Sequence, residues 1–299
     1  MIFPRCSGIL LHVTSLPGGH GIGDLGKSAY DFAQFLANSG QKIWQVLPLS
    51  PTGYGDSPYQ CFSAFAGNPL LIDLTELQEQ GLLSHEDFAD GVDLPDGQVD
   101  YIAVSALKLG LLRKAAEKFF AFFQTSRDAF DIFCRTNADW LDDYALFMSC
   151  KAVYDGRSWM HWDQGIRRRD PVALNQWREK LSNDINLHKF AQFEFFRQWT
   201  KLKAHCNNLG LRIMGDLPIY VAHDSADVWA HPELFRLDED SKPTAVAGVP
   251  PDYFSATGQL WGNPLYRWDR LAASGYKWWI DRFRASFKMF DMVRLDHFR

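Results

Sequence analysis

Four short apolar runs of strand length are spread along the chain, at residues 8–13, 43–47, 211–217 and 292–295. The first run is apolar on both faces, as the buried strands of parallel sheets are. Helical hydrophobic periods separate the runs. Strands that alternate with helices predict an α/β fold with a parallel sheet.

A helix is expected between the first two runs. Phe32, Phe35 and Leu36 recur there at i, i+3 and i+4, as on the apolar face of a helix. Ser28 is a residue type that caps helices, and Gly40 suits the helix end. A strand, a helix and a strand within about forty residues predict one parallel β-α-β unit.

Strand patterns are missing from residues 74–187, where helical periods replace them. So long a stretch is far beyond a normal connection between neighbouring strands. We therefore expect an inserted helical subdomain at residues 75–186, after the second strand. The remainder, residues 1–74 and 187–299, is expected to form the sheet-containing domain.

Polar and aromatic residues gather where the expected strands end. Residues 50–60 and 248–264 are loops rich in Gly, Pro and aromatic rings, and carboxylates end two further strands, at Asp216 and Asp296. The C-terminal strand ends carry the chemistry of a (β/α)₈ barrel, so the pattern predicts its first half, strands one to four. A doubly wound sheet would use the same units, but the chain lacks the GxGxxG phosphate fingerprint. The later loop is compatible with a lid or with a packed connection.

Charged residues cluster at the end of the last strand. Arg294 in an apolar strand is costly to bury unless it meets a carboxylate, and Asp296 lies two residues on, on the same side of the pleat. These residues by themselves fit a catalytic carboxylate or a structural ion pair.

Composition narrows the choice of function. A net charge of −5 and a pI near 6.0 argue against nucleic acid as a partner. No run approaches the length of a membrane span, and five scattered cysteines suit a reduced, cytoplasmic setting. His12 stands without a second histidine in an HxH pair, which disfavours a metal-dependent hydrolase. Aromatic residues make up 15% of the chain, including 11 Trp. Most of these rings must belong to the core, and some surplus is expected where a site stacks rings on a ligand, as sugar sites do.

Five motifs together resemble one known family. The segments at residues 12–17, 51–60, 215–219, 248–263 and 293–299 are similar to those of the 4-α-glucanotransferases, the amylomaltase or disproportionating-enzyme family. The resemblance covers nearly the whole chain in order. It implies transfer of α-1,4-glucan segments between maltooligosaccharides (or starch or glycogen segments), with retention of configuration and without a cofactor.

The resemblance also implies roles for individual residues. Asp296 matches the nucleophile, Arg294 and His297 resemble the residues that orient it, and Tyr59 resembles the ring that stacks on the cleaved glucose. Phe254 and Trp261 would belong to a lid over the acceptor side. The residues implied in substrate binding are Tyr59, Asp56, Ser57, Asp216, Tyr253, Phe254, Trp261, Arg294 and His297.

The chemistry of the residues agrees with this assignment. A retaining glycosidase needs an ionised nucleophile, which Arg294 would support in Asp296, and a protonated carboxyl about 5–5.5 Å away. In the family that acid/base is a glutamate on a fifth strand, and this chain stops three residues after Asp296. We therefore expect an N-terminal portion, inactive and aggregation-prone when made alone. An α-glucan hydrolase and a non-catalytic glucan-binding chain remain as alternatives.

Overall fold

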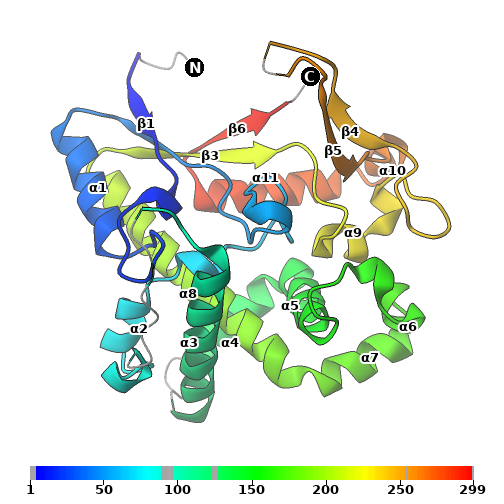
Figure 1. The fold of residues 1–299 in the computed structure, drawn as a ribbon, viewed down its shortest axis with the longest axis horizontal. Coiled ribbons are helices and arrows are strands. Elements are labelled where there is room, and N and C mark those ends of the chain that lie inside the picture. Colours follow the sequence, from blue (N-terminus) through cyan, green and yellow to red (C-terminus); the bar gives the residue numbers. More distant parts are fainter. Residues whose placement is uncertain (1–4, 89–93, 95–96, 123–126, 254, 298–299) are drawn as a thin grey trace.

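The computed structural model describes residues 5–88, 94, 97–122, 127–253 and 255–297. Four parallel strands form one sheet in the order β1-β2-β3-β6 (Figure 1). The strands are β1 (Gly8–Leu10), β2 (Ile43–Gln45), β3 (Arg212–Pro218) and β6 (Met292–Asp296). They lie where the sequence predicts them, and their order across the sheet follows the order along the chain.

The first two strands are shorter than expected. β1 stops at Leu10, because the chain turns into the 3-10 helix η1 (Val13–Ser15), and β2 stops at Gln45. Ile9 and Leu10 are exposed, since β1 lies at an edge of the sheet. The expectation that this strand is buried on both faces is therefore wrong.

Helix α1 (Lys27–Asn38) joins β1 to β2, with a different cap and face from those predicted. Gly26 is its N-cap residue and Ser28 lies inside the helix. Phe35 is exposed, whereas the buried side consists of Ala29, Ala33 and Leu36. Small residues on that side let the helix approach α8 (Ser182–Asn208) closely, which the apolar period does not reveal.

In the described residues between β2 and β3 the named elements are all helices, joined by loops. Figure 1 shows most of them as a layer below the sheet, with α8 running from that layer back to β3. Within the described ranges, no helix is long and apolar enough to cross a membrane. The α-helices of this region are α2 (Leu74–Glu79), α3 (Tyr101–Phe122), α4 (Arg127–Thr136), α5 (Ala138–Val153), α6 (Gln164–Arg167), α7 (Pro171–Lys180) and α8 (Ser182–Asn208). Its 3-10 helices are η2 (Tyr54–Asp56), η3 (Pro69–Leu71), η4 (His85–Phe88) and η5 (Trp159–His161).

The connection from β3 to β6 contains a second, two-stranded sheet. β4 (Val246–Val249) and β5 (Gln259–Pro264) pair antiparallel, where the sequence predicted an irregular loop. The hairpin lies beside the C-terminal end of β6 (Figure 1). The other elements here are α9 (Ala226–Ala230), η6 (Pro232–Leu234), α10 (Trp268–Ala273) and α11 (Lys277–Met289).

Helix α11 delivers the chain to β6, and only some of its aromatic rings are buried. Trp279 is buried, but Phe287 is exposed and Phe290 lies just past the helix end. Phe290 packs against β3 at Gly215, where a Cβ atom would come within 2.3 Å of the phenylalanine ring. Glycine at that position is therefore required for the helix to close onto the sheet.

Two apolar clusters hold these layers together. One joins the sheet to α1, α3 and α8 through buried rings such as Trp44, Phe195 and Trp199. The other joins α5, α9 and α11 through Phe147, Trp229 and others. Burial of large aromatic side chains is the main stabilising contribution here, at roughly 25 cal/mol per Å² of apolar surface.

Candidate active site

The register of β3 and β6 brings three charged side chains to one end of the sheet. Asp216 lies opposite Arg294, and Pro218 lies opposite Asp296. Since residues two apart on a strand point to the same face, Arg294 and Asp296 share a face. The predicted ion pair between them is confirmed, as Arg294 Nη2 donates to Asp296 Oδ1.

The guanidinium of Arg294 joins both carboxylates. Its Nη1 donates to Asp216 Oδ2 at 2.8 Å, while Nη2 holds Asp296. Partial burial lowers the pKa of Arg294, but the charges of Asp216 and Asp296 outweigh this and raise it overall. The fork of a permanently charged guanidinium therefore sets the positions of the two carboxylates.

Tyr59 reaches the same cluster from the loop after β2. Its hydroxyl donates to Asp216 Oδ2 at 2.8 Å. Burial and this bond to a carboxylate both raise the pKa of Tyr59, so the phenol keeps its proton. Burial also raises the pKa of Asp216, against the lowering effects of the Tyr59 hydroxyl and the Arg294 charge. Asp216 Oδ1 is buried and has no hydrogen-bond partner within the described ranges.

His297 and Trp261 form the opposite side of the site. The His297 backbone is left-handed, with φ of 47°, and its Nε2 lies 3.6 Å from Asp296 Oδ2. The Trp261 ring, on β5, lies against the imidazole with 4.7 Å between ring centroids. Gln60 Nε2 donates to the Trp261 carbonyl oxygen and to Asn263 Oδ1, at 3.2 Å each. This side chain ties the hairpin to the loop that carries Tyr59.

These side chains surround a cavity of about 470 Å³, a size typical of small-molecule sites. Asp216 lies behind its wall and is reached through Tyr59 and Arg294. Six of the predicted site residues line the cavity directly: Ser57, Tyr59, Trp261, Arg294, Asp296 and His297.

Two predicted site residues, Asp56 and Tyr253, are not brought to this cavity. Asp56 is exposed at the end of η2 and lines a different cavity, next to α3 and α5. Tyr253, between β4 and β5, is exposed and absent from the lining. Phe254 lies outside the described residues.

Gln60 and Asn263 are cavity residues that the sequence reasoning missed. Both lie at the ends of the two Gly- and Pro-rich loops, where the sequence marks them as the limits of the loops and assigns them no role. Ile219 and Tyr220 also line the cavity. Their place directly after a parallel strand is a signal that could have found them.

The arrangement suits a ligand with many hydroxyl groups. A carboxylate at the wall, a cation behind it and aromatic faces on two sides offer acceptors, charge and stacking surfaces. Within the described part of the chain, no group of three or more His, Cys, Asp or Glu side chains could hold a metal ion.

Comparisons with known proteins agree on one family. Residues 11–299 match the family described as 4-alpha-glucanotransferase. The chain is 52% identical to the 4-alpha-glucanotransferase of Thermus thermophilus, with 100% of this chain and 59% of the relative covered. It is 51% identical to the enzyme of the same name from Synechocystis sp., with 100% and 60% covered. The chain thus spans about 60% of the length of the curated relatives it matches.

Solved structures give the same result for the fold. The amylomaltase from Streptococcus agalactiae in complex with acarbose superposes with a TM-score of 0.93 at 44% identity, over 99% of this chain and 60% of that one. The amylomaltase from Corynebacterium glutamicum superposes with a TM-score of 0.76 at 22% identity, over 98% and 40%, which supports the fold alone. Both neighbours support a barrel of the glycoside hydrolase type.

Proposed function

This chain belongs to the 4-alpha-glucanotransferase family, and from that membership we propose that its complete gene product transfers α-1,4-glucan segments between maltooligosaccharides. The observation that carries the proposal is the Arg294 fork, which holds Asp296 at the wall of the cavity. The acarbose complex of the Streptococcus agalactiae relative supports an oligosaccharide-like ligand. The five cysteines are unpaired, which supports a reducing, cytoplasmic compartment.

The proposal also covers the type of fold and the division of the chain into domains. The four parallel strands are proposed as the first half of a (β/α)₈ barrel, formed by residues 1–74 and 187–299. Residues 75–186 are proposed as the inserted helical subdomain. This boundary falls inside α8 (Ser182–Asn208), so one continuous helix would connect the subdomain to the barrel.

In the proposed reaction Asp296 acts as the nucleophile. Its carboxylate oxygen forms a bond to the anomeric carbon as the bond to the leaving glucan oxygen breaks, and that oxygen takes a proton from an acid/base group. A second glucan hydroxyl then attacks the glycosyl-enzyme, returns a proton to that group and frees Asp296. Two displacements at one carbon give retention. The acid/base group is assigned to none of the described residues, because Asp216 is engaged by Tyr59 and Arg294.

The other site residues position the sugar. The hydroxyl of Tyr59 is anchored on Asp216, so its ring is held in place for stacking on the cleaved glucose. Ser57 and His297 line the cavity and are proposed as hydrogen-bond partners of sugar hydroxyls. Asp56 and Tyr253 do not line the cavity. They remain proposed sugar contacts because they belong to the loops that carry Tyr59 and Trp261.

Maltotriose tests the proposed reaction directly. Incubation with the complete gene product is expected to give a ladder of longer and shorter sugars, as transfer requires. Shorter sugars alone would assign an α-glucan hydrolase, and binding without any new products would assign a non-catalytic glucan-binding protein.

Tyr59→Phe is expected to shift the acid limb of the pH–activity profile upward by about one pH unit. Asp216 must be charged to hold Arg294, so activity falls as pH drops through the pKa of Asp216. The Tyr59 hydroxyl lowers that pKa, against the raising effect of burial. Removing the hydroxyl therefore raises the pKa of Asp216, and activity is lost at a higher pH.

The measurement is kcat/KM for maltotriose as a function of pH. Tyr54→Phe is the matched control, because Tyr54 is exposed in the same loop. If the acid limb of the pH profile does not move in Tyr59→Phe, the charge of Asp216 does not control the proposed activity.

Trp261→Ala is expected to raise the share of hydrolysis over transfer by about 3- to 10-fold. The Trp261 ring covers His297 beside Asp296, so its removal would admit water to the glycosyl-enzyme. Free glucose and the sugar ladder, quantified together from maltotriose, give the ratio. Leu260→Ala is the control, because Leu260 is the exposed neighbour on β5.

Gln60→Leu tests whether the position of the hairpin matters. This variant loses the bonds to the Trp261 carbonyl and to Asn263 but keeps the tryptophan ring. A smaller rise in hydrolysis than in Trp261→Ala is expected. Unchanged product ratios in both variants would remove the hairpin from the control of water access.

A further inference from the structure

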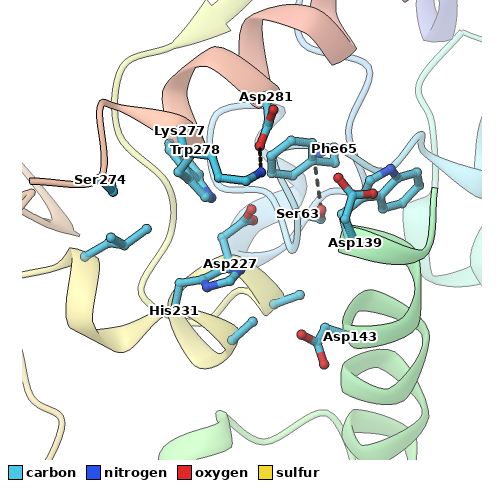
Figure 2. A pocket seen from close by; sticks show the side chains of 14 residues that line it. Ser63, Phe65, Asp139, Asp143, Asp227, His231, Ser274, Lys277, Trp278 and Asp281 are labelled. Carbon is cyan, nitrogen blue, oxygen red and sulfur yellow. Dashed lines mark hydrogen bonds and ion pairs between the residues drawn. The ribbon is translucent and has the colours of Figure 1, made fainter. Parts of the chain in front are cut away.

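A second cavity of about 330 Å³ lies outside the site described above (Figure 2). Its walls come from α5, α9, α11 and the segment at residues 63–65. None of its lining residues belongs to the lining of the first cavity. It lies at the small end of the range for ligand cavities, which suits the end of a ligand chain and not a long segment.

Three aromatic rings form a corner in this cavity. Phe65 and Trp140 are stacked, with 15° between their planes and 6.3 Å between centroids. Trp278 stands at 87° to Phe65, at 6.0 Å. Two flat surfaces at right angles suit a ring with apolar faces.

The indole nitrogen of Trp278 has no partner. Trp278 is 7% exposed, and its Nε1 is buried without a hydrogen bond within the described ranges. Figure 2 shows the indole directed into the cavity on the side of Asp227. Buried N–H groups in folded proteins are nearly always paired, so this donor indicates a missing acceptor.

Carboxylates in the same lining supply acceptors. Asp227 is buried at 5% exposure, and its Oδ2 accepts the backbone N–H of Ala64 at 2.8 Å. Asp139, at the first turn of α5, has no ion-pair partner among the residues that the structure describes. The other two acidic residues of the lining are engaged, Asp143 by Arg169 and Asp281 by Lys277.

Cationic side chains in and beside the cavity offset part of the charge of its carboxylates. Lys277 lies in the lining, and the guanidinium of Arg282 lies 5.3 Å from the ring centroid of Trp278. Burial raises the pKa of Asp227, against the lowering effects of the Ala64 N–H and of Arg282. A neutral ligand rich in hydroxyl groups matches both the donors and the acceptors.

We propose that this cavity is a second, non-catalytic site that binds one end of an α-glucan chain. A glucose ring would place its apolar face in the corner of Phe65 and Trp278 and donate hydroxyl protons to Asp139 and Asp227. Trp278 Nε1 would donate to a sugar oxygen. The choice of α-glucan as the ligand rests on the function proposed above, whereas the cavity and its polar groups do not.

Arg282 connects this site to the first one. It donates to the carbonyl oxygens of Pro218 at 2.6 Å and Ile219 at 3.3 Å, and both of these residues line the first cavity. Its guanidinium also lies over Trp278. A glucan held at the second site would raise the effective concentration of the chain near Asp296.

The test uses the complete gene product with Asp296→Asn, which is not expected to turn over sugar. Maltotriose is added, and binding is followed by calorimetry and by hydrogen exchange. We expect protection at residues 226–231 and 277–281 in addition to the first cavity. Trp278→Phe, which keeps an aromatic ring but removes the N–H, is expected to weaken binding at the second site about 5- to 10-fold. Asp139→Ala, at an exposed position, is expected to do the same.

Trp177→Phe is the matched control, because Trp177 lies in neither cavity. Protection of the first cavity alone would overturn the second site and leave the proposed function intact. Failure of maltotriose to protect either cavity would overturn the proposed function as well. Protection of residues 226–231 by putrescine, and not by maltotriose, would assign a cationic ligand and also overturn the proposal. If Trp278→Phe fails to fold, Asp139→Ala decides, and unchanged affinity in that variant counts against the site.

Discussion

Replacing Asp296 with asparagine is expected to lower maltotriose transfer by about ten-thousand-fold or more. Asparagine has nearly the same shape, and its Oδ1 can still accept the hydrogen bond from Arg294 Nη2. It cannot form the glycosyl-enzyme, so the first displacement is lost. The measurement is the initial rate of ladder formation by the complete gene product, together with its thermal unfolding.

Unfolding of the variant should match that of the unaltered protein, which separates loss of chemistry from loss of fold. Asp31→Asn is the matched control, because Asp31 is an exposed carboxylate on α1 that pairs with Lys27. Retention of more than about a tenth of the transfer rate by Asp296→Asn would return Asp296 to the role of a structural ion-pair partner.

Arg294→Met is expected to lower transfer by about a thousandfold and the free energy of unfolding by about 1–3 kcal/mol. The guanidinium holds two carboxylates at once, and the side chain of Asp216 is fully buried. Without the cation, the Tyr59 hydroxyl is the one remaining side-chain partner of buried Asp216 among the described residues, and Asp296 loses the group that orients it. Activity and urea unfolding are measured on the same preparation.

Arg294→Lys separates the charge from the geometry. A lysine keeps the charge but lacks the planar fork, so it reaches one carboxylate well and an intermediate loss of activity is expected. Arg284→Met is the control, since Arg284 is an exposed arginine on α11 paired with Asp281. If Arg294→Met keeps activity within tenfold of the unaltered protein, the fork does not position the nucleophile.

Prediction from the sequence succeeded where the signal is local. The four strands and the helical character of the region between β2 and β3 follow from hydrophobic periods, which depend on residues close together in the sequence. The contact of Arg294 with Asp296 is local too, because two residues on one strand face the same way. Errors occurred where neighbours in space decide, as for the exposed β1 at the sheet edge and for Phe35 on the outer face of α1.

The sequence by itself determined the types of side chain at the strand ends and the parallel α/β arrangement that gathers those ends together. Only the tertiary structure decided that Tyr59 bonds Asp216 across 157 residues of chain, and that Asp216 lies opposite Arg294. It also decided that residues 246–264 form a hairpin tied down by Gln60, and that Trp278 directs an unpaired N–H into a second cavity. The physical reason is that such contacts depend on strand register and on packing between distant segments. Those are properties of the whole folded chain, and no local period or composition encodes them.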